Sequence, residues 1–344
     1  DAEKAVAQGR GILAKNLNCK PKELIFTSGG TESNNLAIKG IAEFYQNRGK
    51  HIITTKIEHP SVLEVCQELE QEGFAITYLE VDHLGNISLE ELQEAITPET
   101  ILVTIMMVNN ELGAVQPIKD LAAIIKKQGK APFFHVDGVQ AMGMLPIDLQ
   151  ELSIDLFSFS GHKFHGPKGV GGLFIKEGVQ LVPLLDGGGQ EKGIRSGTEN
   201  VPGIVGMAKA LAIAGEARED KAAKIRALQQ LLWNGISTEV ADCKLNSDLV
   251  IGAPHIISIS FPGIKGEVLL HYLESEGIYV STGSACGSRS RNISHVLQAI
   301  GLNDKEADGT IRFSLSVETE EADILYTVDK ITAGIKELRL LMGR

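Results

Sequence analysis

Short apolar runs alternate with helix-length amphipathic segments over roughly the first 220 residues. Segments such as TESNNLAIKGIAEFYQ and IKDLAAIIKKQG separate several of the apolar runs. This alternation is typical of a layered α/β domain with a mostly parallel sheet, because parallel strands need a long crossover between them. The predicted strands are 23–27, 51–56, 75–80, 101–108, 133–137, 155–160 and 171–175.

The pattern changes in the last third of the chain. A long helical stretch runs from about 203 to 233, and the shorter apolar runs IISISF, IYVST and IRFSL follow it. A helix near 266–276 and a Gly/Ser-rich loop separate these runs, and a helix closes the chain. We therefore predict a large α/β domain over 1–218 and a small α+β domain over 219–344.

Polar residues follow five of the predicted strands at their carboxyl ends. In open α/β sheets, ligands bind in the crevice beyond these ends. We therefore expect the five groups to converge on one site. The groups are Ser28, Gly29, Gly30 and Thr31; Glu58 and His59; Asn109 and Asn110; Asp137 with Gln140; and Ser160, Gly161, His162 and Lys163.

Each group taken alone has both a functional and a structural interpretation. The Gly-rich turn around Thr31 suits a phosphate, or Thr31 is an ordinary helix cap. Asp137 could keep a pyridinium nitrogen protonated, or it is a turn aspartate. Lys163 could form a Schiff base if it is partly desolvated, or it is a solvated loop lysine. His59 could stack on a planar cofactor, or it is a loop histidine.

Two residues of the predicted small domain also suggest chemistry. Arg312 lies on the strand face opposite the apolar side chains of IRFSL, where it could clamp a carboxylate or simply be an exposed edge-strand arginine. Cys286 lies in the loop STGSACGSRSRN beside Arg289 and Arg291, whose charges favour the thiolate. The remaining cysteines lie in or beside apolar periodic segments and are predicted to be structural; they are Cys19, Cys66 and Cys243.

Charge and composition exclude several classes of protein. The net charge of -11 argues against a protein that wraps nucleic acid, which needs surplus Lys and Arg. The longest apolar run, ILVTIMMV, is far too short for a membrane span. The four cysteines are too scattered for a disulfide framework or a CxxC metal site and indicate a reducing cytosol. We expect a cytoplasmic protein without a secretory segment.

Eight stretches together resemble the NifS/IscS-like cysteine desulfurases, and they occur in that family's order over most of the chain. The resemblance implies a PLP-dependent transferase of the aspartate aminotransferase-like fold type I, with the cofactor in the large domain. The stretches are TSGGTESNNLAIKG, EHPSV, VNNELGAVQPI, HVDGVQ, SFSGHKFHGPKGVGG, RSGTEN, STGSACGS and IRFSL.

The resemblance implies a role for each candidate around the cofactor, pyridoxal 5'-phosphate. Lys163 would hold it as a Schiff base, and Asp137 would pair with its pyridine nitrogen. Gln140 would hydrogen-bond the ring hydroxyl, and His59 would stack on the ring and take part in catalysis. The implied phosphate ligands are Gly30, Thr31, Ser160, His162 and, from the other subunit of a homodimer, Thr198.

The resemblance also implies the substrate and the path of the sulfur. Asn110 and Arg312 would bind the carboxylate of L-cysteine, and Cys286 would receive the sulfur as a persulfide, which leaves L-alanine. A long mobile loop of about 283–292 would deliver it to an acceptor such as an iron–sulfur scaffold or a tRNA-thiolation protein. No metal ligand is implied, apart from a transient contact between Cys286 and an iron–sulfur cluster.

Other functions of the same fold stay open as alternatives. They are a selenocysteine lyase, a small-substrate aminotransferase and a non-catalytic sulfur-transfer platform. Cys286 in a Gly/Ser-rich loop argues against the aminotransferase, while Lys163 and Asp137 argue against the platform. Members of the family usually carry a further front segment with an AATT-like stretch beside the substrate. We expect that this chain lacks that segment by truncation.

Overall fold

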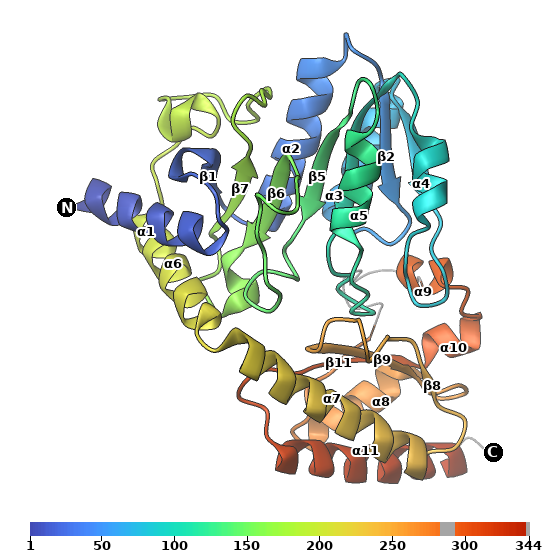
Figure 1. The fold of residues 1–344 in the computed structure, drawn as a ribbon. Helices are drawn as coiled ribbons and strands as arrows, with labels where there is room; N and C mark the ends of the chain where they lie inside the picture. Colours follow the sequence, from blue (N-terminus) through green and yellow to red (C-terminus); the bar gives the residue numbers. More distant parts are fainter. Residues whose placement is uncertain (283–292, 342–344) are drawn as a thin grey trace. The chain divides into compact units, whose positions relative to one another are not determined.

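The computed structural model describes residues 1–282 and 293–341, which belong to two compact units (Figure 1). The first unit comprises 1–80, 87–108 and 116–218. The second comprises 81–86, 109–115 and the residues from 219 onward. Two short segments that interrupt the first unit in sequence therefore belong to the second. The predicted assignment of all of 1–218 to one functional domain stays a prediction.

The described residues of the first unit form a seven-stranded sheet in the order β1-β7-β6-β5-β4-β2-β3. Strand β7 is antiparallel to both of its neighbours, and the other pairs are parallel, so six strands run in one direction. The predicted mostly parallel sheet is confirmed. The strands are β1 Leu24–Thr27, β2 His51–Thr55, β3 Ala75–Leu79, β4 Thr100–Met106, β5 Phe133–Asp137, β6 Leu156–Ser160 and β7 Gly171–Ile175.

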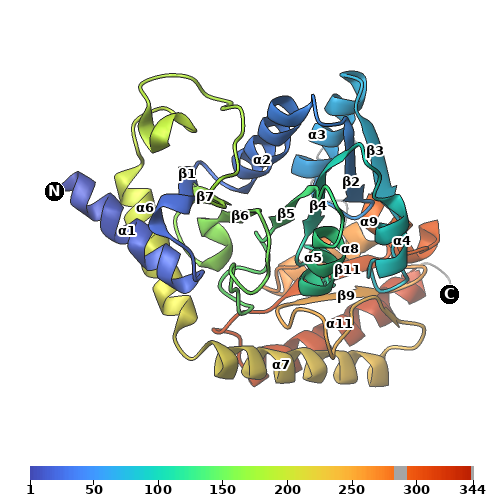
Figure 2. The same cartoon turned by 45° about the horizontal axis from the view of Figure 1, so that its top comes forward.

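Helices cover both faces of this sheet, with α2 and α3 on one face and α5 on the other (Figure 2). Strands β2, β4 and β6 are buried along their whole length, as expected for central strands covered on both faces. The helices are α1 Ala2–Asn16, α2 Gly30–Tyr45, α3 Pro60–Gln71, α4 Leu89–Ala95, α5 Ile118–Lys126 and α6 Val201–Gly215. The 3-10 turns are η1 Pro21–Glu23, η2 Gly161–Phe164 and η3 Gln190–Gly193.

The helical stretch predicted over about 203–233 is present but is divided into two helices. Helix α6 ends at Gly215, and α7 (Arg218–Glu239) begins after a break. Ala217 in the break has a φ of 47°, in the left-handed region, which interrupts the helical hydrogen bonds. The apolar periodicity continues across the break, so the pattern alone does not reveal it.

The described part of the second unit contains a four-stranded antiparallel sheet in the order β10-β11-β9-β8. Apolar side chains of α7, α8 and α11 pack with β9 and β11 in one core. This is the predicted smaller α+β part of the fold. The strands are β8 Lys244–Leu245, β9 Ile256–Ser260, β10 Ser281–Thr282 and β11 Thr310–Ser314. The further helices are α8 Gly266–Ser275, α9 His295–Ala299, α10 Asp304–Asp308 and α11 Glu321–Leu341.

Across the residues that the structure describes, every helix is too short or too polar to traverse a lipid bilayer.

Candidate active site

Three strand ends of the first unit meet at the start of α2. A Cβ added to Gly30, the first residue of α2, would lie 2.6 Å from Val139 Cγ2 and 3.7 Å from Ser160 Cβ. The turn after β1 therefore touches the turn after β5 and the end of β6. The first N–H groups of a helix lack partners within the helix and carry the positive end of its dipole. The start of α2 can therefore hold an anionic group such as a phosphate.

The charge of Glu32 in the first turn of α2 is compensated by its neighbours. Its carboxylate pairs with the Arg195 guanidinium at 2.8 Å and accepts a hydrogen bond from the Ser28 backbone N–H at 2.8 Å. An uncompensated carboxylate there would repel a phosphate. The ion pair with Arg195 therefore keeps the helix start suitable for an anion.

The end of β6 contributes the next group of predicted residues. Ser160 is 1% exposed, and its Oγ lies 3.0 Å from Nδ1 of His162. His162 and Lys163 follow in the turn η2, where both side chains are exposed. Burial lowers the pKa of His162, and the charges of Lys163 and Lys168 lower it further. These effects favour a neutral His162, and the exposed Lys163 lies next to it in sequence.

Asp137 ends β5 as a buried carboxylate that is 5% exposed. Its Oδ1 accepts a hydrogen bond from the Val139 backbone N–H at 2.9 Å, and its Oδ2 accepts one from Asn34 Nδ2 at 2.7 Å. Burial raises the pKa of Asp137, while these hydrogen bonds and the charges of His59 and Lys163 lower it. Groups from three separate strand ends therefore act on one carboxylate.

His59 is connected to Asp137 through two residues that the sequence analysis missed. His59 is the N-cap of α3, and its Nδ1 accepts the Ser61 N–H at 3.1 Å. The Oγ of Ser61 lies 2.8 Å from the same Nδ1 and 2.9 Å from Asn34 Nδ2. Asn34 lies four residues after Gly30 in α2, so the two share a helix face. That spacing was the available signal for Asn34.

Glu58 is a third residue to which the sequence analysis gave no role. It is fully buried, and its Oε1 accepts Thr55 Oγ1 at 2.8 Å and the Met106 N–H at 2.9 Å. Burial raises the pKa of Glu58 to about 8, and the nearby Asp137 charge adds to the rise. Glu58 is therefore mostly protonated at neutral pH.

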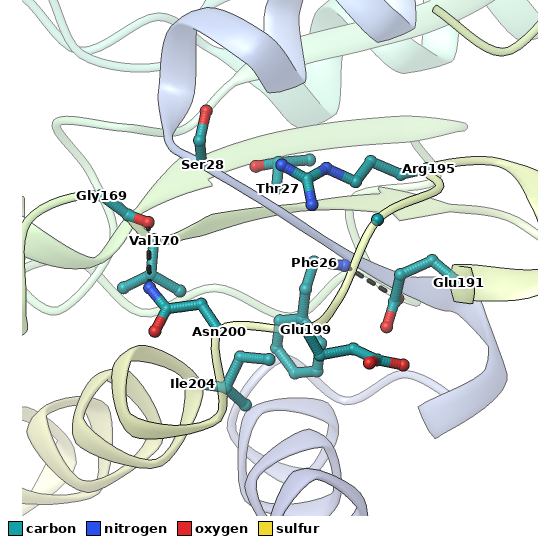
Figure 3. Close-up of a pocket in the computed structure, with 11 residues that line it drawn as sticks. Phe26, Thr27, Ser28, Gly169, Val170, Glu191, Arg195, Glu199, Asn200 and Ile204 are labelled. Atoms are coloured by element: carbon teal, nitrogen blue, oxygen red, sulfur yellow. Dashed lines mark hydrogen bonds between the residues drawn. The ribbon is translucent and has the colours of Figure 1, made fainter. Parts of the chain in front are cut away.

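Gln140 and Thr198 are the remaining predicted cofactor ligands. Gln140 is half-buried in the turn that follows Asp137, and Thr198 is exposed between η3 and α6. The neighbours of Thr198, Gly197 and Glu199, line a small pocket together with Ser28 (Figure 3). The predicted contact of Thr198 with another subunit stays a prediction.

Asn110 and Arg312 both belong to the second unit, where they are in contact. Arg312 lies on β11, and its Nη1 donates to the Asn110 carbonyl at 2.9 Å. The next residue, Glu111, accepts the Ser294 hydroxyl at 2.6 Å. Burial raises the pKa of Glu111, and the charges of His295 and Arg312 oppose that rise. The two predicted substrate ligands are thus adjacent.

The predicted nucleophile, Cys286, lies outside the described residues. Its role and the loop of about 283–292 stay predictions. Among the residues that are described, no group of three or more His, Cys, Asp and Glu side chains is arranged to hold a metal.

Comparisons with known proteins agree with this fold. The family model for class-V aminotransferases matches residues 1–326. The chain therefore belongs to the class-V aminotransferase family. This result confirms the predicted fold class, since the layered sheet and the smaller α+β part are those of that family.

Within this family the chain is similar to cysteine desulfurases, as the eight stretches predicted. It is 48% identical over 340 residues to the cysteine desulfurase IscS of Salmonella paratyphi B, covering 98% of this chain and 83% of that protein. A solved NifS-like protein is 42% identical with a TM-score of 0.92, covering 98% and 89% of the two chains. The structure of SspA in complex with cysteine is 39% identical with a TM-score of 0.79, covering 93% and 88%.

Proposed function

We propose that the protein is a cysteine desulfurase that binds pyridoxal 5'-phosphate at Lys163 and takes sulfur from L-cysteine onto Cys286. The observation that carries the proposal is the buried Asp137 carboxylate, on which the charges of Lys163 and His59 act. The relatives named cysteine desulfurase IscS and the SspA structure with cysteine support the reaction and the substrate.

The described residues fit this cofactor. A pyridinium N–H would stabilise the buried charge of Asp137, to which two uncharged N–H groups already donate. The phosphate would bind at the start of α2, with Thr31, Ser160 and His162 as further ligands. Gln140 and Thr198 are the proposed ligands at the ring hydroxyl and across a homodimer interface.

The protein's residues would prepare and direct the reaction. When bound, the cofactor supplies an electron sink for the charge left on the substrate Cα. Asp137 holds the proton on the pyridine nitrogen, and His59 covers one face of the ring. Lys163 Nζ accepts the proton that leaves Cα. Arg312 and Asn110 of the second unit bind the substrate carboxylate and so orient the substrate.

The sulfur transfer would be a displacement at the substrate sulfur. The Cys286 thiolate forms the S–S bond as the substrate Cβ–S bond breaks, and protonation of the carbon fragment gives alanine. We further propose a cytoplasmic homodimer that passes the persulfide to an acceptor such as an iron–sulfur scaffold or a tRNA-thiolation protein.

Replacing Cys286 by Ala tests the proposal directly. We expect Cys286→Ala to keep the visible absorption of the bound cofactor but to lose persulfide transfer, because no thiolate attacks the sulfur. Alanine release from L-cysteine and persulfide on the protein are the measurements. Cys243→Ala is the matched control and should behave like the unmodified protein. Undiminished persulfide transfer in Cys286→Ala would refute the assigned nucleophile, and no alanine release by the unmodified protein would refute the desulfurase.

A further inference from the structure

A chain of side-chain hydrogen bonds joins Asp137 to His59 through Asn34 and Ser61. These residues come from β5, the second turn of α2 and the start of α3, so the chain spans three elements of the first unit. The three contacts measure 2.7 Å, 2.9 Å and 2.8 Å in order from Asp137. The two contacts of Asn34 join residues that are far apart in sequence, whereas the contact between Ser61 and His59 is local to the start of α3.

The amide of Asn34 can adopt only one orientation in this chain. An ionised carboxylate accepts hydrogen bonds only, so Asn34 must present its NH₂ group to Asp137. The second hydrogen of that NH₂ group is then directed to Ser61 Oγ. Asn34 is 1% exposed, and its Oδ1 has no hydrogen-bond partner among the described residues. The two donated bonds, and not the carbonyl, therefore hold this side chain.

The direction of the bonds continues to the imidazole. Because Ser61 Oγ accepts from Asn34, its own hydrogen is free to point to His59 Nδ1. The Ser61 backbone N–H also points to Nδ1. A proton on Nδ1 would face this N–H across 3.1 Å, which is repulsive. Nδ1 is therefore an acceptor, and a neutral His59 carries its proton on Nε2.

We propose that Asn34 and Ser61 are positioning residues. They fix the His59 ring as the Nε2–H tautomer and fix the position of the Asp137 carboxylate relative to that ring. The functional part of this inference rests on the proposed function, in which His59 covers the cofactor ring and Asp137 pairs with its nitrogen. One hydrogen-bonded chain then positions both the His59 side chain on the face of the cofactor ring and the Asp137 carboxylate at its nitrogen. A change at either end of the chain should therefore displace the residue at the other end.

Histidine NMR on the cofactor-free full chain tests the tautomer without reference to any activity. With ¹⁵N-labelled histidine, the His59 resonances, assigned with His59→Gln, should report a protonated Nε2 in the unmodified protein. Ser61→Ala should raise the fraction of the Nδ1–H tautomer, because one of the two donors to Nδ1 is lost and only the backbone N–H remains. Ser61→Thr should restore the single tautomer. A protonated Nδ1 in the unmodified protein, or an unchanged tautomer in Ser61→Ala, overturns the proposal.

Cofactor binding tests the coupling to Asp137. Asn34→Ala removes a hydrogen bond to a charged group, so the Kd for pyridoxal 5'-phosphate should rise about ten- to a hundredfold. Ser88→Ala is the control, because it also removes a side-chain hydrogen bond, the one that Ser88 Oγ accepts from the Glu91 N–H, but lies outside the site. Its Kd should stay unchanged, and its thermal unfolding measures the cost of losing a cap. A Kd in Asn34→Ala equal to that of Ser88→Ala overturns the coupling.

The two experiments separate this inference from the proposed function. A fixed Nε2–H tautomer in a protein that binds no pyridoxal 5'-phosphate would sustain the hydrogen-bond chain and refute the desulfurase. A mixture of His59 tautomers in a protein that releases alanine from cysteine would refute the hydrogen-bond chain and leave the proposed desulfurase activity intact.

Discussion

Glu58 shows what a buried carboxylate does to the energetics of the site. The residue lies between β2 and β4, where Thr55 and Met106 donate to one of its oxygens. In the proposed function, the neighbouring Asp137 needs its own charge to hold a pyridinium. A second charge at Glu58 would oppose that ionisation, so a protonated Glu58 favours a charged Asp137.

Glu58 should therefore make the stability of the protein depend on pH. Its pKa rises from 4.5 to about 8 on folding, so between these values the folded state holds a proton that the unfolded state has lost. The contribution is complete below pH 4.5 and is lost as the pH rises through 8. Glu58→Gln keeps an acceptor oxygen and cannot ionise. As the pH rises from 4.5 to about 8, the unfolding free energy of Glu58→Gln should fall by about 3–5 kcal/mol less than that of the unmodified protein.

Urea unfolding at a series of pH values measures this difference. Glu94→Gln, an exposed change on α4, is the control and should follow the unmodified protein. Parallel pH profiles for Glu58→Gln and the unmodified protein would show that Glu58 is ionised in the folded state.

Local patterns predict individual residues of the site better than their partners. The positions of Asp137, Ser160 and Lys163 followed from apolar strands that end in polar residues. The bonds of Asn34 to Asp137 and Ser61 cross 103 and 27 residues of chain, so no local pattern contains them. The protonation of Glu58 likewise depends on burial by other strands, which periodicity does not report.

At the scale of elements, the strands of the first unit were predictable because each is a short run rich in apolar residues, and β2, β4 and β6 are buried along their whole length. The order of the strands was not, since β7 pairs antiparallel between β1 and β6 through long-range contacts. The apolar run IYVST is a strand only at its end. Only Ser281–Thr282 pairs as β10, and Tyr279 is 81% exposed. An apolar pattern does not show whether a partner strand is available.

The turn that carries Asp137 depends on a glycine. A Cβ on Gly138 would lie 1.8 Å from Cζ of Phe157 on β6, so no larger residue fits unless the ring or the turn moves. Gly138→Ala should cost about 1–3 kcal/mol or more of unfolding free energy and weaken cofactor binding. Thermal unfolding and cofactor absorption are the measurements.

Gly11→Ala is the matched control for this substitution. Gly11 lies in α1 with nothing within 4 Å of an added Cβ, so alanine there should be neutral or stabilising. Equal stability of the Gly138→Ala and Gly11→Ala variants would contradict the close contact with Phe157.

At the scale of the whole molecule, cofactor binding should appear as a gain in stability. Pyridoxal 5'-phosphate at 100 times its Kd adds about 2.7 kcal/mol to the unfolding free energy, because only the folded chain binds it. The unfolding temperature of the cofactor-free protein should rise accordingly. Lys163→Ala should show a smaller rise, since the covalent bond is lost, while the exposed Lys130→Ala should match the unmodified protein. Equal rises in all three would mean that Lys163 does not hold the cofactor.

The assignment of 109–115 to the second unit has a consequence for protein engineering. Inside that unit, Asn110 accepts from Arg312, Gly113 O accepts the Ala253 N–H, and Leu112 O accepts from Ser247. A chimaera that takes only the part from 219 onward from a relative would combine 109–115 of one protein with the contacting residues of another at all three contacts. Recombination between such proteins should therefore succeed more often when 109–115 is inherited together with the C-terminal part.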